Sequence, residues 1–114
     1  MIVFRMTRFT SFLFFVGAAF NSVEAAPPSF LYEVEPILSR AGCNLGGCHG
    51  NATGKGGFQL SLRNENPEMD YNALAGQHAG RRVNAFKPED SLILLKATQA
   101  VPHEGGKRFD KGHL

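Results

Sequence analysis

The residues best suited to chemistry lie in the stretch AGCNLGGCHG, residues 41–50, which holds the two cysteines of the chain and a histidine directly after the second. Attachment sites for covalent haem c have two residues between the cysteines and a histidine next to the second one. Here Cys43 and Cys48 enclose four residues before His49. Both thiols can reach one haem edge only if the extra residues bulge outward, and Gly46 and Gly47 have the backbone freedom for such a bulge.

Residue types alone leave more than one chemistry open for this motif. Haem would bond to both thiols and take His49 as an iron ligand. A disulfide between Cys43 and Cys48 would close a short loop, and disulfides persist in exported proteins. A zinc or copper site needs about four ligands, and the motif supplies three, so this is the least favoured reading. Haem and disulfide both remain open at this point.

An electron-transfer haem usually has a second axial ligand. The chain offers four candidates, Met69, His78, His103 and His113. Met69 falls in a helical first turn, where a packing role is favoured. His78 falls on an apolar helix face, where we expect it to be buried, and His113 lies next to the chain end. Since His103 follows a rigid proline and precedes two glycines, its loop can pass close to a flat cofactor, and it is the preferred candidate.

The first 25 residues have the pattern of a secretory signal peptide. Arg5 and Arg8 form a basic region, residues 12–20 are apolar and uncharged, and small residues up to Ala25 form a cleavage site. The apolar run is shorter than the about 20 residues of a membrane-spanning helix. We therefore expect an exported chain in the periplasm or at the cell surface, with no membrane span after cleavage.

The mature chain, residues 26–114, is small and nearly neutral. Cleavage removes two arginines and one glutamate, so the formal charge falls from +2 to +1. This charge excludes a basic nucleic-acid binder, and no nucleic-acid partner is expected. A domain of this size is marginally stable unless a disulfide, a metal or a cofactor adds to its core.

An amphipathic helix is expected to lead into the cysteine motif. Ser29 can cap it, apolar residues recur on one face from Phe30 to Ala41, and Gly42 can end it. After the motif, residues 58–63 alternate apolar and polar side chains, which predicts a short half-buried strand or extended segment.

Two further short helices are expected. Asn66 and Pro67 begin one that runs to Gly80. Pro88 lies early in the other, which covers residues 87–98. Helices this short depend on packing more than on propensity.

Six ordered segments resemble the planctomycete-type cytochrome c-like domain: VEPILSRAGCNLGGCHG, GKGGFQLSL, DYNALAG, GRRV, PEDSLILLKAT and VPHEGGKR. The similarity covers nearly all of residues 30–114. It implies a mainly α-helical, cytochrome c-like domain of short helices and long loops over residues 26–114. It also implies one covalent haem c on Cys43 and Cys48, with His49 as the proximal and His103 as the distal iron ligand.

The family carries this domain at the N-terminus of large exported cell-surface proteins, which implies further domains in the same parent protein. Its C-terminal helix would follow residue 114, so we expect the domain to be incomplete at that end. The implied function is electron transfer with a redox partner protein rather than enzyme catalysis. Arg81 and Arg82 are candidates for contacts with the haem propionates, because guanidinium binds carboxylates bidentately.

Two alternatives to this function remain. One is a haem-free surface interaction module held by a Cys43–Cys48 disulfide. The other is a haem sensor or peroxidase-like domain with an open distal site.

Overall fold

The computed structural model describes residues 25–113. Within this range the chain is mainly helical and contains no strand, which confirms the predicted fold class. Almost all of the predicted signal peptide, residues 1–24, lies outside the described part. No helix between residues 25 and 113 is both long and apolar enough to cross a membrane.

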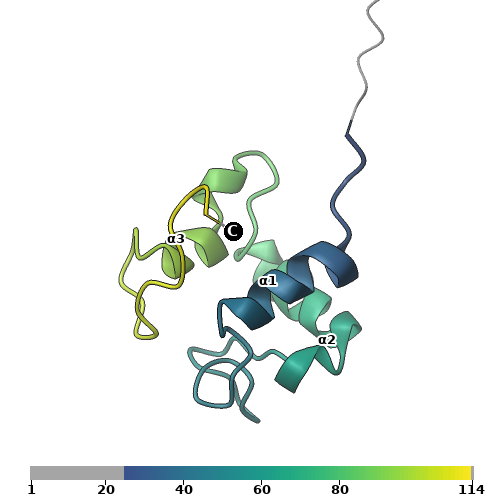
Figure 1. The fold of residues 1–114 in the computed structure, drawn as a ribbon, viewed down its shortest axis with the longest axis vertical. Helices are drawn as coiled ribbons and strands as arrows, with labels where there is room; N and C mark the ends of the chain where they lie inside the picture. The colour runs from purple at the N-terminus through teal and green to yellow at the C-terminus, as the bar shows by residue number, and fades with distance from the viewer. Residues whose placement is uncertain (1–24, 114) are drawn as a thin grey trace, which may run out of the picture.

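Short helical segments follow one another along the chain (Figure 1). They are a π-helical turn at Phe30–Val34, helix α1 at Glu35–Arg40, a 3-10 turn at Leu62–Asn64, helix α2 at Pro67–Tyr71, a π-helical turn at Asn72–Gly76, 3-10 turns at Gln77–Gly80 and Pro88–Asp90, and helix α3 at Leu92–Ala97. Figure 1 shows α1 beside α2 in one half of the molecule and α3 with the C-terminal segment in the other.

The first helix begins and ends where the sequence predicts. The Ser29 hydroxyl accepts a hydrogen bond from the Tyr32 N–H at 3.3 Å and caps the π-helical turn that leads into α1. Pro36 lies in the first turn of α1, where its missing N–H costs no hydrogen bond. Gly42 follows the helix with φ +74°, a left-handed conformation that favours glycine and ends helices.

Of the two alternatives for residues 58–63, the structure has the extended segment and no strand, and a 3-10 turn begins at Leu62. Phe58 and Leu60 are buried as the alternation suggests, but the Leu60 N–H donates to the His49 carbonyl at 2.8 Å and the Ser61 N–H to Asp70 Oδ1 at 2.5 Å. The His49 carbonyl and the Asp70 carboxylate thus accept the hydrogen bonds that a partner strand would otherwise accept. The alternation arises because one side of an extended segment packs on the core, and an isolated bridge between Lys55 and Phe58 is the β-type pairing within residues 25–113.

The second predicted helix is shorter than expected. Asn66 caps α2 by accepting from the Met69 N–H at 3.0 Å, as predicted. The helical path is lost before Gly80 because His78 and Ala79 take φ values of +52° and +54°. The expected burial of His78 is therefore wrong: its side chain is exposed, because the chain leaves the helix before His78 can join the apolar face.

The third predicted helix starts later than expected. Ser91 is extended, with ψ 129°, and separates the 3-10 turn at Pro88–Asp90 from α3. Its buried hydroxyl accepts from the Asn84 N–H at 3.0 Å, which ties the preceding loop to the start of α3.

The core lies between α1, the cysteine loop and the helical turns after α2. Its buried members are Leu38, Cys43, Phe58, Leu60, Ala73 and Leu74. At one end the Phe30 ring packs edge-on against the Tyr71 ring, with centroids 5.2 Å apart, and joins the first helical turn to α2.

Two buried carboxyl groups meet at the packing of α1 on α2. Glu35 and Asp70 are each 1% exposed. Asp70 accepts hydrogen bonds from the main-chain N–H and the hydroxyl of Ser61, whereas no donor among the described residues reaches the carboxyl oxygens of Glu35. Burial, and then the neighbouring Asp70 carboxylate, raise the pKa of Glu35 to about 7.

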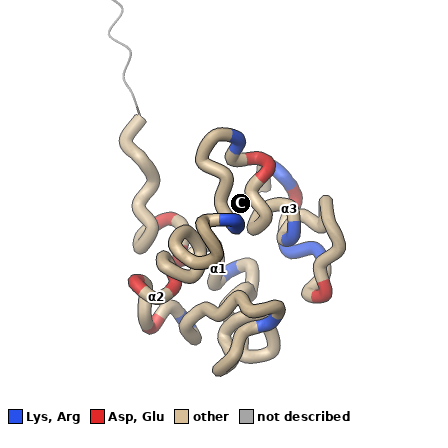
Figure 2. Tube along the Cα trace, turned by 180° about the vertical axis from the view of Figure 1, so that it is seen from behind, with Lys and Arg blue, Asp and Glu red and all other residues tan. Residues whose placement is uncertain are grey.

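Basic side chains are concentrated on one half of the molecule. Figure 2 shows most Lys and Arg on the half that contains α3, whereas Asp and Glu lie on both halves. The basic half is the one that forms much of the cavity described next.

Candidate functional site

The cysteine loop folds back on the end of α1. The Cys43 N–H donates to the Leu38 carbonyl at 2.9 Å, and the His49 N–H donates to the Cys43 carbonyl at 3.0 Å. The residues between the cysteines turn outward, and those at positions 45–47 are exposed. The four-residue spacing therefore forms a compact turn that leaves both cysteines on the wall of one cavity.

The glycines that this loop requires differ from those expected. Gly46 and Gly47 have no positive φ, and a Cβ at either would meet nothing within 4 Å. A Cβ at Gly50 would lie 2.0 Å from the Asn44 carbonyl oxygen, and one at Gly54 would lie 2.2 Å from the Phe58 carbonyl oxygen. The close approaches are thus at Gly50 and Gly54, after the motif, and the backbone freedom of Gly46 and Gly47 is not used.

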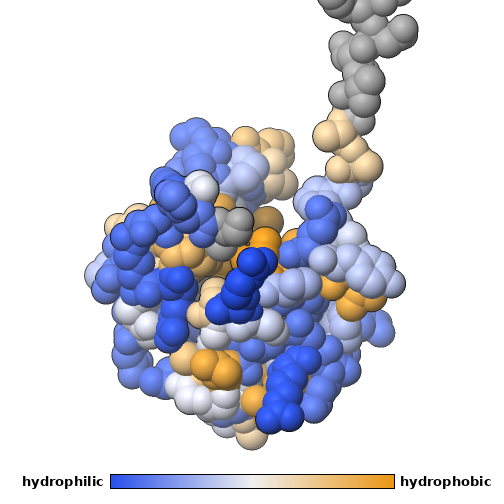
Figure 3. All heavy atoms as spheres, viewed as in Figure 1, coloured by the Kyte–Doolittle hydropathy of each residue, from blue (hydrophilic) through white to orange (hydrophobic). Residues whose placement is uncertain are grey.

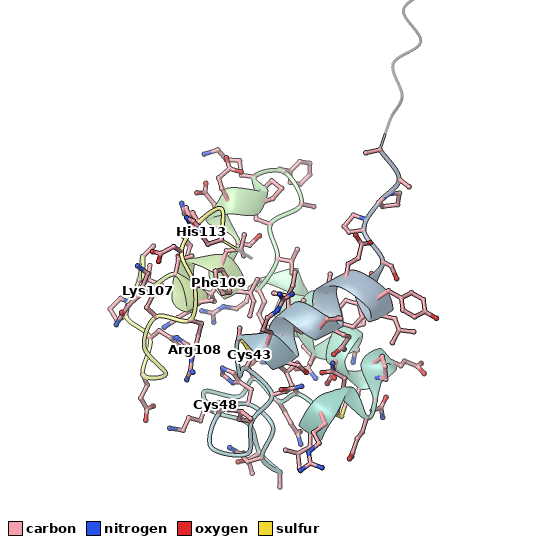
Figure 4. The ribbon with its side chains drawn as sticks, viewed as in Figure 1. Cys43, Cys48, Lys107, Arg108, Phe109 and His113 are labelled. Carbon is pink, nitrogen blue, oxygen red and sulfur yellow. The ribbon has the colours of Figure 1, made fainter. Side chains whose placement is uncertain are left out.

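A cavity of about 450 Å³ separates the cysteine loop from α3 and the C-terminal segment. Figure 4 shows Arg108, carried by that segment, beside the loop with Cys43 and Cys48. Five basic side chains line the cavity, against one acid, Glu104: Lys55, Arg81, Arg82, Lys96 and Arg108. Phe58, Leu92, Ile93 and Ala97 supply its apolar surface. A flat, largely apolar ligand with acidic groups fits this lining.

The structure brings His49 and His103 to the same cavity and holds each imidazole in the same way. His49 Nδ1 lies 2.9 Å from the Phe58 carbonyl oxygen, and His103 Nδ1 lies 2.8 Å from the Gly106 carbonyl oxygen. A carbonyl can only accept, so each Nδ1 carries the proton and each Nε2 keeps a free lone pair. Histidines that bind metals are typically held by this second hydrogen bond.

The two imidazole rings are parallel and stacked. Their centroids are 6.3 Å apart, and their planes differ by 7°. The nitrogen lone pairs lie in the ring planes, so one ring must turn before both can bind the same metal ion. Burial lowers the pKa of His49, which favours the neutral imidazole that a metal needs.

Four contacts fix the loop that carries His103. Arg108 N–H donates to the Ala97 carbonyl at 2.7 Å, and Lys96 Nζ donates to the Pro102 carbonyl at 2.6 Å. Lys55 forms a 3.0 Å ion pair with Glu104 across the cavity, and His103 itself bonds to Gly106. Only the position of Pro102 before His103 suggested a fixed loop in the sequence.

The predicted propionate contacts, Arg81 and Arg82, both line the cavity but differ in environment. Arg81 is exposed and makes no side-chain hydrogen bond to the described residues. Arg82 is 7% exposed and donates to the carbonyls of Ala73 and Gly57, at 2.6 and 2.9 Å. Arg81 is the guanidinium free to pair with a ligand.

The described residues bear less closely on the disulfide and on a metal site without haem. Both cysteine thiols are free, and burial raises the pKa of Cys43. No group of three or more His, Cys, Asp and Glu side chains within residues 25–113 is arranged to hold a metal ion directly. Of the other ligand candidates, the exposed His78 lines the cavity, whereas Met69 and His113 are not part of its lining.

A second, smaller hollow of about 150 Å³ lies between α1 and α3. Its lining is apolar and includes Val34, Ile37, Ile93 and Phe109. Figure 3 shows hydrophobic side chains at the bottom of this hollow.

Comparison of the chain with protein-family models, curated proteins and solved structures gave no match.

Proposed function

We propose that this chain is an exported electron-transfer domain that carries one covalent haem c. Cys43 and Cys48 would hold the macrocycle through thioether bonds, and His49 and His103 would ligate its iron. The observation that supports the proposal is that Cys43, Cys48, His49 and His103 line one cavity, with the Nδ1 of each histidine held by a main-chain carbonyl.

The residues present fit this group. Both cysteines and both histidines line one cavity, whose apolar surface suits a porphyrin and whose basic side chains balance two propionates. When bound, haem supplies a one-electron iron couple. The Phe58 and Gly106 carbonyls orient the imidazoles and increase their basicity, and two imidazoles favour a lower potential than a histidine–methionine pair.

Covalent attachment is the direct test. Full-length chain made in a host with haem c maturation is expected to stain for haem on a denaturing gel and to give a pyridine haemochrome spectrum. The double variant Cys43→Ala/Cys48→Ala is expected to lose this haem completely. Gly46→Ala is the matched control in the same loop, since its Cβ meets nothing within 4 Å, and it should keep the haem.

Absence of covalent haem in the wild-type chain, with a mass two hydrogens below that of the reduced chain, would sink the proposal. That outcome would support the interaction module held by a Cys43–Cys48 disulfide instead.

The distal ligand has a separate test. His103→Ala is expected to convert the low-spin visible spectrum of the oxidised protein to a high-spin one, because one axial position loses its imidazole. His78→Ala removes an exposed histidine from the same cavity wall and should leave the spectrum unchanged. A low-spin spectrum that survives in His103→Ala rejects the assignment, and a high-spin wild type supports the sensor or peroxidase-like alternative.

A further inference from the structure

Arg82 is a buried cation without an acidic partner. Its side chain is 7% exposed, and none of the ion pairs within residues 25–113 involves it. Burial, and then the adjacent Arg81, lower the pKa of its guanidinium. A buried charge is costly unless its surroundings compensate it, so the contacts that Arg82 makes are informative.

The guanidinium of Arg82 contacts two other segments of the chain. Nη1 donates to the Ala73 carbonyl in the helical turn after α2, and Nη2 donates to the Gly57 carbonyl in the loop after the cysteine motif. Its central carbon lies 4.6 Å from the centroid of the Phe58 ring, a cation–π distance. Arg82 therefore fixes both the main chain at Gly57 and the side chain of Phe58.

Phe58 in turn makes two contacts with His49. Its carbonyl oxygen lies 2.9 Å from His49 Nδ1, and its ring centroid lies 4.7 Å from that of His49. The peptide unit that Arg82 holds at Gly57 is the one directly before Phe58. A shift of this segment would move the acceptor of the Nδ1 proton.

We propose that Arg82 is a positioning residue for His49, acting through Gly57 and Phe58 to keep the Nδ1 proton on the Phe58 carbonyl and the Nε2 lone pair in the cavity. This differs from the propionate contact expected from the sequence, because its two terminal nitrogens already donate to main-chain carbonyls. The effect on a bound haem rests on the proposed function, whereas the hydrogen bond of His49 is a property of the chain itself.

The first experiment uses full-length chain without haem, labelled with ¹⁵N at histidine and studied by NMR. Wild-type His49 is expected to be the Nδ1–H tautomer with a slowly exchanging proton. Arg82→Lys keeps the charge but cannot span both carbonyls, so exchange of that proton should accelerate at least tenfold and the Nε2–H tautomer should become detectable.

Two controls separate positioning from stability. Arg63→Lys makes the same exchange at an exposed arginine outside the cavity lining and should leave His49 unchanged. Asp70→Asn removes an equally buried charge away from the cavity and should lower stability without changing the His49 tautomer. Wild-type His49 signals in folded Arg82→Lys, or the same change in Asp70→Asn, would overturn the proposal.

The second experiment is for the case in which the Arg82→Lys chain folds only when haem is bound. In the haem-loaded protein the reduction potential is expected to rise relative to wild type, because an imidazole without its Nδ1–H hydrogen bond donates less charge to iron. Arg63→Lys and Asp70→Asn are the controls here too, for the same exchange outside the cavity and for lower stability, and both should keep the wild-type potential. An unchanged potential in Arg82→Lys overturns the positioning role, whereas wild-type chain that takes up no haem contradicts the proposed function and leaves the NMR result to decide on Arg82.

Discussion

Glutamine in place of Glu35 is expected to stabilise the protein by up to about 3 kcal/mol at pH 8 and to have little effect near pH 4. Glu35 has a folded-state pKa of about 7 against an ordinary value of 4.5. This shift of about 2.5 units corresponds to about 3 kcal/mol at about 1.36 kcal/mol per unit. Glutamine cannot ionise, so it removes the charge that destabilises the buried pair above neutral pH.

The direction of this pH dependence follows from whether the folded or the unfolded chain holds the Glu35 proton. Below about pH 4.5 the Glu35 carboxyl is protonated in both the folded and the unfolded chain, and burial carries no charge penalty. Between about pH 4.5 and 7 the unfolded chain loses this proton while the folded chain keeps it. The free energy of unfolding of the wild type therefore falls as pH rises through this window and levels off above it.

Urea unfolding at pH 4, 6 and 8 measures this effect. Glu65→Gln is the matched control, since Glu65 is an exposed glutamate near the same pair of helices and should follow the wild-type curve. Wild-type stability that is constant between pH 4.5 and 7, or Glu35→Gln that is no more stable than wild type at pH 8, contradicts the prediction.

Alanine at position 54 is expected to destabilise the protein by several kcal/mol, well beyond alanine at position 56. Both glycines have left-handed backbones, with φ +67° and +60°, which cost alanine about 1–2 kcal/mol. A Cβ at Gly54 would also lie 2.2 Å from the Phe58 carbonyl oxygen, whereas one at Gly56 would meet nothing within 4 Å. Relieving that overlap requires a main-chain shift, and overpacking of this kind typically costs about 1–3 kcal/mol more.

Thermal and urea unfolding of the two variants give the difference directly, because the conformational penalty is nearly the same in both. The overlap is with the carbonyl that holds His49 Nδ1. Gly54→Ala should therefore also disturb the His49 signals that respond to Arg82→Lys, and Gly56→Ala should not. Equal stability of the two variants would show that the loop yields to the methyl group without strain.

Local signals in the sequence predicted the starts of the first two helical segments and the end of the first one correctly. The Ser29 and Asn66 caps and the Gly42 terminus depend on neighbouring residues, so they are readable without knowledge of the fold. The alternation over residues 58–63 could not separate a strand from an extended segment, because burial of alternate side chains gives the same pattern whether a partner strand or a loop supplies the hydrogen bonds.

The cavity was predictable in its residue types but not in its supports. Cys43, Cys48, His49 and His103 stood out by type and spacing, and they line one cavity. The contact of Arg82 with Gly57 joins positions 25 residues apart, and no periodicity or motif connects them. Main-chain carbonyls accept the hydrogen bonds of both histidines. Every residue has such a carbonyl, so no residue type in the sequence marks the acceptors.

The Lys55–Glu104 ion pair across the cavity is expected to respond to salt. It is exposed, with side chains 47% and 81% accessible, and it connects the loops on opposite sides of the cavity. An exposed pair of this kind contributes at most about 1 kcal/mol, which corresponds to roughly a fivefold preference for the closed pair. The pair therefore breaks often while the main-chain contacts of the His103 loop persist, and added salt, which screens the pair, should keep Lys55 and Glu104 apart for a larger share of the time.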